Sequence, residues 1–165
     1  GGPERLVAVD PPPALGRGLN GGCTCWLPDG SGWIYLSRGG RVDLHLLTGE
    51  QRSLARFDPA VDLSSPTVSP DGRRLAVVID LAEVQVLSID DGRVLASFPA
   101  APAWDFVMDP VWNGSSLAWQ AWRVPFMPWG RSVVIGEDGA VLGEGGPEAV
   151  GAYVWAQAQA GWPPS

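Results

Sequence analysis

The residues best able to do chemistry in this chain are two cysteines and its one histidine. Cys23 and Cys25 lie two positions apart, and His45 follows farther along the chain. Thiolate sulfur and imidazole nitrogen are preferred ligands of zinc, but a structural zinc site takes four ligands. A disulfide across two cysteines so close in sequence would be strained. We therefore expect two small buried thiols, with zinc as the weaker interpretation, and no metal site.

Nucleophilic catalysis by a serine would need a histidine as general base and an acid to orient it. The only histidine, His45, lies within a strand-like run over residues 42–47, and no Gly-x-Ser-x-Gly segment is present. That segment is the signature of the nucleophile in α/β-hydrolases. We expect no catalytic residue and no cofactor in this chain.

Aspartates recur in short turn-like segments, where paired carboxylates would suit acid–base chemistry. The segments are Pro28-Asp29-Gly30, Pro70-Asp71-Gly72 and, without the acid, Asn113-Gly114. Their glycines are separated by 42 residues twice, because 72 − 30 = 42 and 114 − 72 = 42. Glycine supplies a positive φ in turns, and aspartate caps neighbouring backbone N–H groups. A fixed place in a repeat favours turn formation over catalysis for Asp29 and Asp71.

A period of about 40–45 residues that carries short strands is typical of a β-propeller blade. Gly and Pro are abundant, at 22 and 16 residues, which suits a chain rich in turns. Since 165/42 is nearly four, we predict an all-β partial β-propeller. It has about four blades of four-stranded antiparallel sheets, the last blade being incomplete.

The repeat also divides the chain. We expect blades at about 22–60, 61–105 and 106–146, with partial blades at 1–21 and 147–165. Gly49, Gly92 and Gly139 mark the late hairpin of each blade, and a loop over 125–130 accounts for the longer last interval. The Asp91-Gly92 pair predicts a type I′ turn.

Charge and hydropathy exclude some partners. The net charge is −7, and the 11 basic residues, all arginine, are scattered along the chain. No basic stripe forms, which argues against nucleic-acid binding. No apolar run is long enough for a membrane helix. The first residues lack the features of a signal peptide, so we expect a cytoplasmic protein.

Aromatic residues are dense in the third expected blade. Trp119, Trp122 and Trp129 could line a ligand site beside Arg123, since arginine binds carboxylates with two hydrogen bonds. Nine tryptophans in this length favour packing between blades for most of them. A salt bridge or a solvated position is the simpler interpretation of Arg123.

Two segments resemble repeats of known propeller families. Residues 69–76, Ser-Pro-Asp-Gly-Arg-Arg-Leu-Ala, resemble the repeat of TolB-type, WD40-like propellers. Residues 117–129 resemble a blade of the S9 (prolyl oligopeptidase) family, in the acylaminoacyl-peptidase and dipeptidyl-aminopeptidase-like branch. The matching residues are Leu117-Ala118-Trp119, Trp122, Pro125 and Met127-Pro128-Trp129. Arg123-Val124 and Gly130 depart from that pattern.

The S9 resemblance implies a noncatalytic propeller segment that gates peptide access to an α/β-hydrolase domain of the same parent protein. Trp122, Arg123 and Trp129 would then be the substrate-gating residues, and a peptide the substrate. The alternative is a stand-alone WD40-like scaffold that binds a protein or peptide partner. Either way we expect an open arc of blades, which aggregates or oligomerises through Trp155 and Trp162.

Overall fold

The computed structural model describes residues 23–123 and 132–145, and these residues form only strands, turns and loops. The first sheet, blade one, contains β1 (Cys23–Trp26), β2 (Gly32–Ser37), β3 (Arg41–Leu46) and β4 (Gln51–Arg56). Blade two contains β5 (Leu63–Val68), β6 (Arg74–Ile79), β7 (Glu83–Ser88) and β8 (Val94–Pro99). Blade three contains β9 (Phe106–Asn113), β10 (Ser116–Trp122), β11 (Ser132–Gly136) and β12 (Val141–Gly145).

Each sheet is a meander in which strands pair antiparallel in chain order. The all-β, four-stranded blade predicted from the repeat is therefore confirmed. Each sheet lies inside one expected interval, 22–60, 61–105 or 106–146. The partial blades expected at 1–21 and 147–165 and the loop expected at 125–130 lie outside the described residues.

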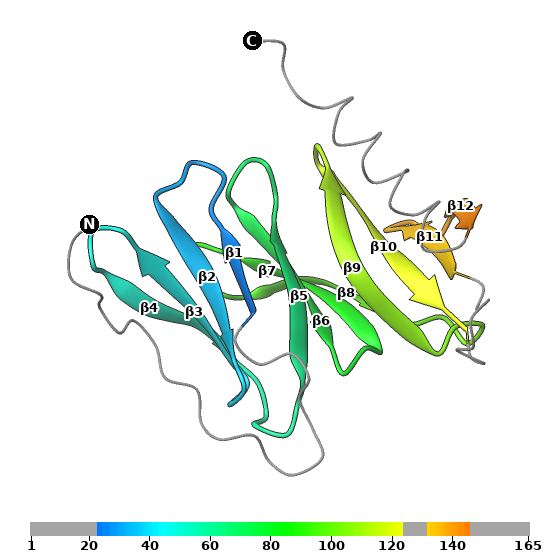
Figure 1. The fold of residues 1–165 in the computed structure, drawn as a ribbon, viewed down its shortest axis with the longest axis horizontal. Coiled ribbons are helices and arrows are strands. Elements are labelled where there is room, and N and C mark those ends of the chain that lie inside the picture. Colours follow the sequence, from blue (N-terminus) through cyan, green and yellow to red (C-terminus); the bar gives the residue numbers. More distant parts are fainter. Residues whose placement is uncertain (1–22, 124–131, 146–165) are drawn as a thin grey trace.

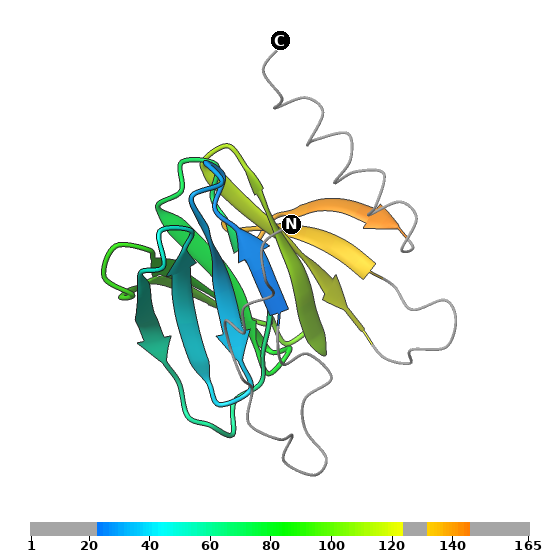
Figure 2. The ribbon, with the colours of Figure 1, turned by 60° about the vertical axis from the view of Figure 1, so that its left-hand side comes forward.

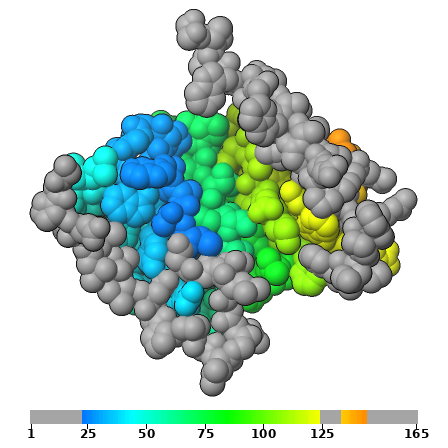
Figure 3. All heavy atoms as spheres, in the orientation of Figure 1, coloured from blue at the N-terminus to red at the C-terminus, as the bar shows by residue number. Residues whose placement is uncertain are grey.

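The three blades follow one another in space in chain order, with blade two between the other two (Figure 1). The turned view shows the sheets fanning out, and the first strands β1, β5 and β9 are neighbours (Figure 2). On the surface the blades form adjoining bands from blue through green to yellow (Figure 3). The first strand of each blade therefore occupies the inner edge of the arc.

Alternation along the strands gives every blade two apolar faces. Between blades one and two, Ile34 and Leu36 of β2 share a buried cluster with Leu75, Val77 and Ile79 of β6. The alternate residues of β6 turn the other way, toward blade three. Successive residues of a single strand thus serve two different blade interfaces.

The interface between blades two and three is built around one indole. Trp119 of β10 is 6% exposed and lies in a buried cluster with Ala76 and Val78. Its ring centroid lies 5.0 Å from that of Phe98 on β8. The packing expected for Trp119 is confirmed, because the ring fills the space beside two small residues of the neighbouring blade.

Two arginines join neighbouring blades at their turns. Arg52 of β4 donates to the carbonyl oxygens of Ile89 and Asp90, at 2.7 and 2.5 Å. Arg74 of β6 donates to the Ser115 carbonyl oxygen at 3.0 Å and lies 4.4 Å from the centre of the Trp112 ring. Each guanidinium satisfies turn carbonyls of the next blade, and the second adds a cation–π contact.

Gly30, Gly72 and Gly114 occupy the same place in the three blades, in the turn between the first two strands. Their φ angles are +72°, +72° and +58°, a region that side chains other than glycine rarely adopt. The spacing of 42 thus reports a repeated backbone conformation.

The prediction of a type I′ turn at Asp91-Gly92 is wrong. Gly92 has a positive φ but Asp91 does not, and a type I′ turn needs both. The Gly92 N–H donates instead to the Ser88 carbonyl at 2.8 Å, which closes a longer turn. The Asp91 carboxylate caps that turn by accepting from the Arg93 N–H at 3.3 Å.

The turn between β6 and β7 has an unusual backbone conformation, which the sequence did not predict. Asp80 and Leu81 both have positive φ, at 51° and 57°. Leu81 is held there because its carbonyl accepts from the Val107 N–H of blade three at 2.7 Å. Contacts with two other segments, at Asp62 and Val107, thus stabilise a backbone that leucine alone disfavours.

The backbone of Gly92 in blade two lies against the Leu54 carbonyl of blade one, so we predict that Gly92→Ala destabilises the chain strongly. A Cβ there would lie 1.6 Å from the Leu54 carbonyl oxygen. The equivalent Gly49 of blade one has a φ of +95° and no atom within 4 Å of such a Cβ. Urea unfolding should show a loss of about 1 kcal/mol for Gly49→Ala and a clearly larger loss for Gly92→Ala. Equal losses would contradict the close approach.

Candidate functional site

A groove lies between the repeated turns of blades one and two. Its volume is about 360 Å³, and Leu27, Pro28, Asp29, Pro70, Asp71 and Gly72 line it. The residues come from equivalent turns 42 positions apart, and stacking of the blades brings them together. Two prolines supply an apolar surface and two carboxylates a polar one, which suits an extended peptide segment.

The two groove carboxylates also stabilise their own turns. Asp29 Oδ1 accepts from the backbone N–H of Ser31 at 2.9 Å and from its hydroxyl at 2.7 Å. Asp71 Oδ1 accepts from the Ser69 hydroxyl at 2.5 Å and from the Arg73 N–H at 3.1 Å. These hydrogen bonds favour the charged form, so the pKa of each carboxyl is lowered. The Ser31 N–H is the largest cause for Asp29, and the Ser69 hydroxyl is the largest cause for Asp71. Both acids are therefore ionised at neutral pH.

The lowered pKa of Asp71 predicts a pH-dependent contribution to stability. A carboxyl that is more acidic in the folded state stabilises fully above its unfolded pKa of about 3.9. That contribution is lost as the pH falls through the lower folded pKa. Asp71→Asn should therefore lower the free energy of unfolding at pH 7 and lose most of this effect near pH 3. Glu50→Gln, an exposed change in a hairpin outside the groove, is the control. A cost for Asp71→Asn that is the same at both pH values would contradict the capping interaction.

The cysteines and the histidine do not form one site. In the strand register Cys25 pairs with Ile34 and Ile34 with Leu44, whereas His45 pairs with Trp33. Neighbouring positions of a strand face opposite sides, so the thiols and the imidazole lie on opposite faces of blade one. The described residues hold no cluster of three or more potential metal ligands.

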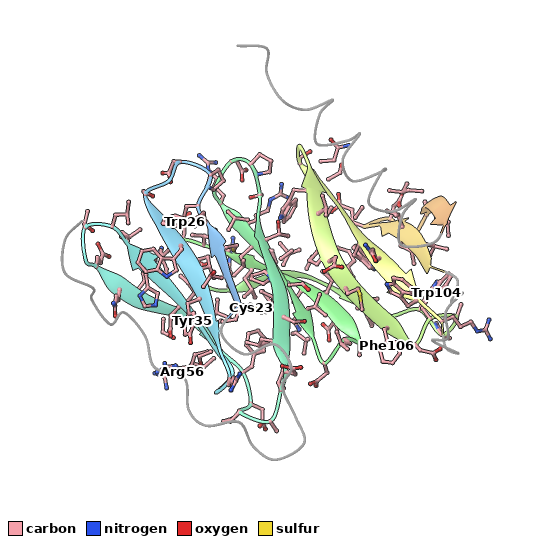
Figure 4. The ribbon with its side chains drawn as sticks, in the orientation of Figure 1. Cys23, Trp26, Tyr35, Arg56, Trp104 and Phe106 are labelled. Carbon is pink, nitrogen blue, oxygen red and sulfur yellow. The ribbon has the colours of Figure 1, made fainter. Side chains whose placement is uncertain are left out.

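The thiols are half-buried and not fully buried as expected, because they lie on the short first strand at the inner edge of blade one. Figure 4 shows Cys23 on the side of β1 that faces β5. Burial raises the pKa of the Cys25 thiol to about 12. Metal ligation needs the thiolate, so this environment opposes it.

His45 is enclosed by aromatic rings. It is 5% exposed, stacks on Trp33 with ring centroids 5.3 Å apart, and meets Tyr35 edge-on at 6.1 Å. Neither ring nitrogen has a hydrogen-bond partner. Among residues 23–123 and 132–145, no serine and no acid is hydrogen-bonded to His45 as a catalytic triad would require.

The tryptophans expected near one another are separated. Trp119 faces blade two, whereas Trp122, three residues on, lies on the opposite face with Gln120, whose side-chain oxygen accepts from the indole N–H at 3.1 Å. Arg123 follows at the end of β10 and is exposed. Of the expected gating group, Trp122 and Arg123 are consecutive residues at the end of β10, and Trp129 lies outside the described residues.

Two features of the inner edge were not foreseen from the sequence. β5 and β9 each contain a bulge, and Ser65 and Asp109 have positive φ angles of 48° and 49° there. The Ser65 hydroxyl donates to Asp109 Oδ1 at 3.3 Å across the two blades. Neither residue type is a strong signal for a bulge, which depends on the pairing of the whole strand.

No family model and no curated protein matches the chain. Solved structures that match it include the mitotic checkpoint complex (16% identity, TM-score 0.54), with coverage of 86% of this chain and 48% of that chain. Another is a putative TolB from Agrobacterium tumefaciens (14% identity, TM-score 0.51), with coverage of 72% and 46%. The RRP9 WD40 repeats match at 12% identity and a TM-score of 0.54, with coverage of 78% and 39%.

The chain thus spans less than half of the length of these neighbours. Within residues 23–123 and 132–145 no helix is long and apolar enough to cross a membrane. At these identities the likeness concerns the fold alone, and that fold is the WD40-like and TolB-like β-propeller.

Proposed function

We propose that this chain is a noncatalytic β-propeller scaffold that binds a peptide or protein segment in the groove between the turns of blades one and two. The observation that carries the proposal is the groove itself, in which exposed Pro28 and Pro70 lie beside the carboxylates of Asp29 and Asp71. Enclosure of His45 by aromatic rings is consistent with a noncatalytic role for that residue.

The groove has the features of a peptide site. Pro28 and Pro70 are exposed on its two sides, and their rings are rigid, so little entropy is lost when a ligand packs on them. Asp29 and Asp71 add negative charge at fixed positions, which favours a ligand segment with a basic residue. Equivalent turns of the two packed blades hold these prolines and carboxylates in fixed positions.

Groove binding predicts a specific loss on mutation. Peptides selected on the purified chain from a phage-displayed random library should carry basic residues beside apolar ones. Pro28→Trp, which fills the groove, should weaken their binding at least tenfold in isothermal calorimetry. Glu50→Trp places the same side chain on an exposed hairpin and should leave binding unchanged. Peptides that bind the Pro28→Trp variant as tightly would refute the groove as the site.

A second function is supported by the segment 117–122, which resembles an S9 blade. We infer that the parent protein carries an α/β-hydrolase domain, and that the propeller gates the access of peptides to it. Trp122 and Arg123 lie at the end of β10, directly before the Pro125–Trp129 part of the motif. In that setting Arg123 would bind the substrate carboxylate, and Trp122 and Trp129 would border the entrance.

The S9 interpretation predicts where a serine-reactive probe binds. A fluorophosphonate should leave the 165-residue chain unlabelled, because it holds no triad. The protein purified from its native cells should be labelled at a serine outside this sequence, identified by mass spectrometry. Labelling of a serine within residues 1–165 would contradict the noncatalytic assignment, and absence of label on the native protein would contradict the S9 parent.

A further inference from the structure

Arginine side chains bridge neighbouring blades at two places, and in each the guanidinium donates to turn carbonyl oxygens. Arg52 of blade one reaches the carbonyl oxygens of Ile89 and Asp90 in blade two. Arg74 of blade two reaches the Ser115 carbonyl oxygen in blade three at 3.0 Å. The turns between the first two strands of the three blades lie along one edge of the arc, at the top of Figure 1. The Arg74 bridge therefore joins the blades at the edge that also carries the groove.

At the junction of blades one and two, glycine occupies the position that arginine occupies one blade later. Gly32 and Arg74 are 42 residues apart, and each begins the second strand of its blade. The Gly32 carbonyl oxygen accepts from the Leu27 N–H at 2.9 Å. In the same way the Arg74 carbonyl oxygen accepts from the Ser69 N–H at 2.8 Å. Blade one thus has the backbone of this arginine position without the guanidinium.

The packing of blade one requires this glycine. A Cβ on Gly32 would lie 2.3 Å from the His45 carbonyl oxygen and 3.1 Å from the Leu46 Cα. Both are backbone atoms of β3, so a side chain at this position would force apart two paired strands. Blade one therefore cannot supply its own bridging arginine, and the junction contains the groove instead.

The groove has the groups that a guanidinium binds. Asp29 and Asp71 line it beside the exposed rings of Pro28 and Pro70. Each carboxylate uses its Oδ1 atom in the hydrogen bonds that stabilise its own turn. A carboxylate has about four acceptor sites on its two oxygens, so each retains capacity for a ligand donor.

The two groove carboxylates differ in the positive charge nearby. The pKa of Asp71 is lowered first by the Ser69 hydroxyl, and the charges of the two arginines at 73–74 lower it further. The causes that lower the pKa of Asp29 are led by the Ser31 N–H, and no charge of the described residues is among them. Asp29 is therefore the groove carboxylate whose charge a cationic ligand would balance.

We propose that the groove binds an arginine side chain of its ligand, at the junction equivalent to the one that Arg74 bridges between blades two and three. This inference rests on the proposed function, because it names the residue by which the groove recognises a peptide or protein segment. The ligand guanidinium donates to the Asp29 carboxylate and lies on the rings of Pro28 and Pro70. The Arg74 guanidinium has a similar arrangement, with a hydrogen bond to a turn and an indole ring 4.4 Å away.

Arginine suits this groove better than lysine does. Its planar guanidinium presents several donors in a fixed fork that matches a carboxylate, and it is weakly hydrated, so it can lie against a ring. The lysine ammonium is a compact and strongly hydrated charge. We therefore expect the groove to distinguish the two basic residues.

Isothermal calorimetry with one selected peptide in three forms tests this specificity. A peptide that Pro28→Trp excludes is made with arginine, lysine or citrulline, a neutral analogue of arginine, at its basic position. Binding should weaken about fivefold with citrulline and about threefold with lysine, the range of an exposed ion pair. Asp29→Asn retains an oxygen for the turn, so it should weaken the arginine peptide similarly and leave the citrulline peptide unchanged. Glu50→Gln removes the same charge from an exposed hairpin and should change none of the three affinities.

The outcomes separate this inference from the proposed function. Groove peptides that carry no basic residue, or that bind equally well with arginine, lysine and citrulline, would overturn the arginine site and leave the groove as a peptide site. So would equal effects of Asp29→Asn on the arginine and citrulline peptides, because that loss would come from the turn. If no peptide is selected, or if Pro28→Trp weakens none of those selected, the groove fails as a peptide site, and the arginine site fails with it.

Discussion

Face-to-face packing of the sheets is the interaction on which the rest of this structure depends. A four-stranded sheet whose residues alternate in direction has two apolar faces and buries neither alone. Blade two satisfies both, with Leu75 and Val77 toward blade one and Ala76 and Val78 toward blade three. The turns, the groove and the arginine contacts all lie where this stacking places them.

Stacking is also the reason that our proposal places binding at the turns and not on the strands. The residues with the most reactive chemistry, Cys25 and His45, are used in packing on opposite faces of one sheet. Burial raises the pKa of the first, and aromatic rings enclose the second. The groups left at the surface are prolines, turn carboxylates and the exposed Arg123, which suit recognition.

The sequence predicted the repeat well because Gly30, Gly72 and Gly114 mark a backbone conformation that few other residues adopt. It predicted the packing of Trp119 from composition alone. It failed where long-range contacts decide the local backbone, as at Asp80 and Leu81, whose positive φ is stabilised by other segments. It also missed the groove, because the groove exists only once blades one and two are stacked.

The most direct test of this account is a double-mutant cycle across the interface of blades two and three. Phe98→Leu and Trp119→Leu each truncate one ring of a pair whose centroids lie 5.0 Å apart. If the two sheets are packed through these rings, the unfolding free energies of the single and double variants should reveal a coupling of about 0.5–1.5 kcal/mol. Effects that add to within about 0.3 kcal/mol would contradict the stacking of the blades.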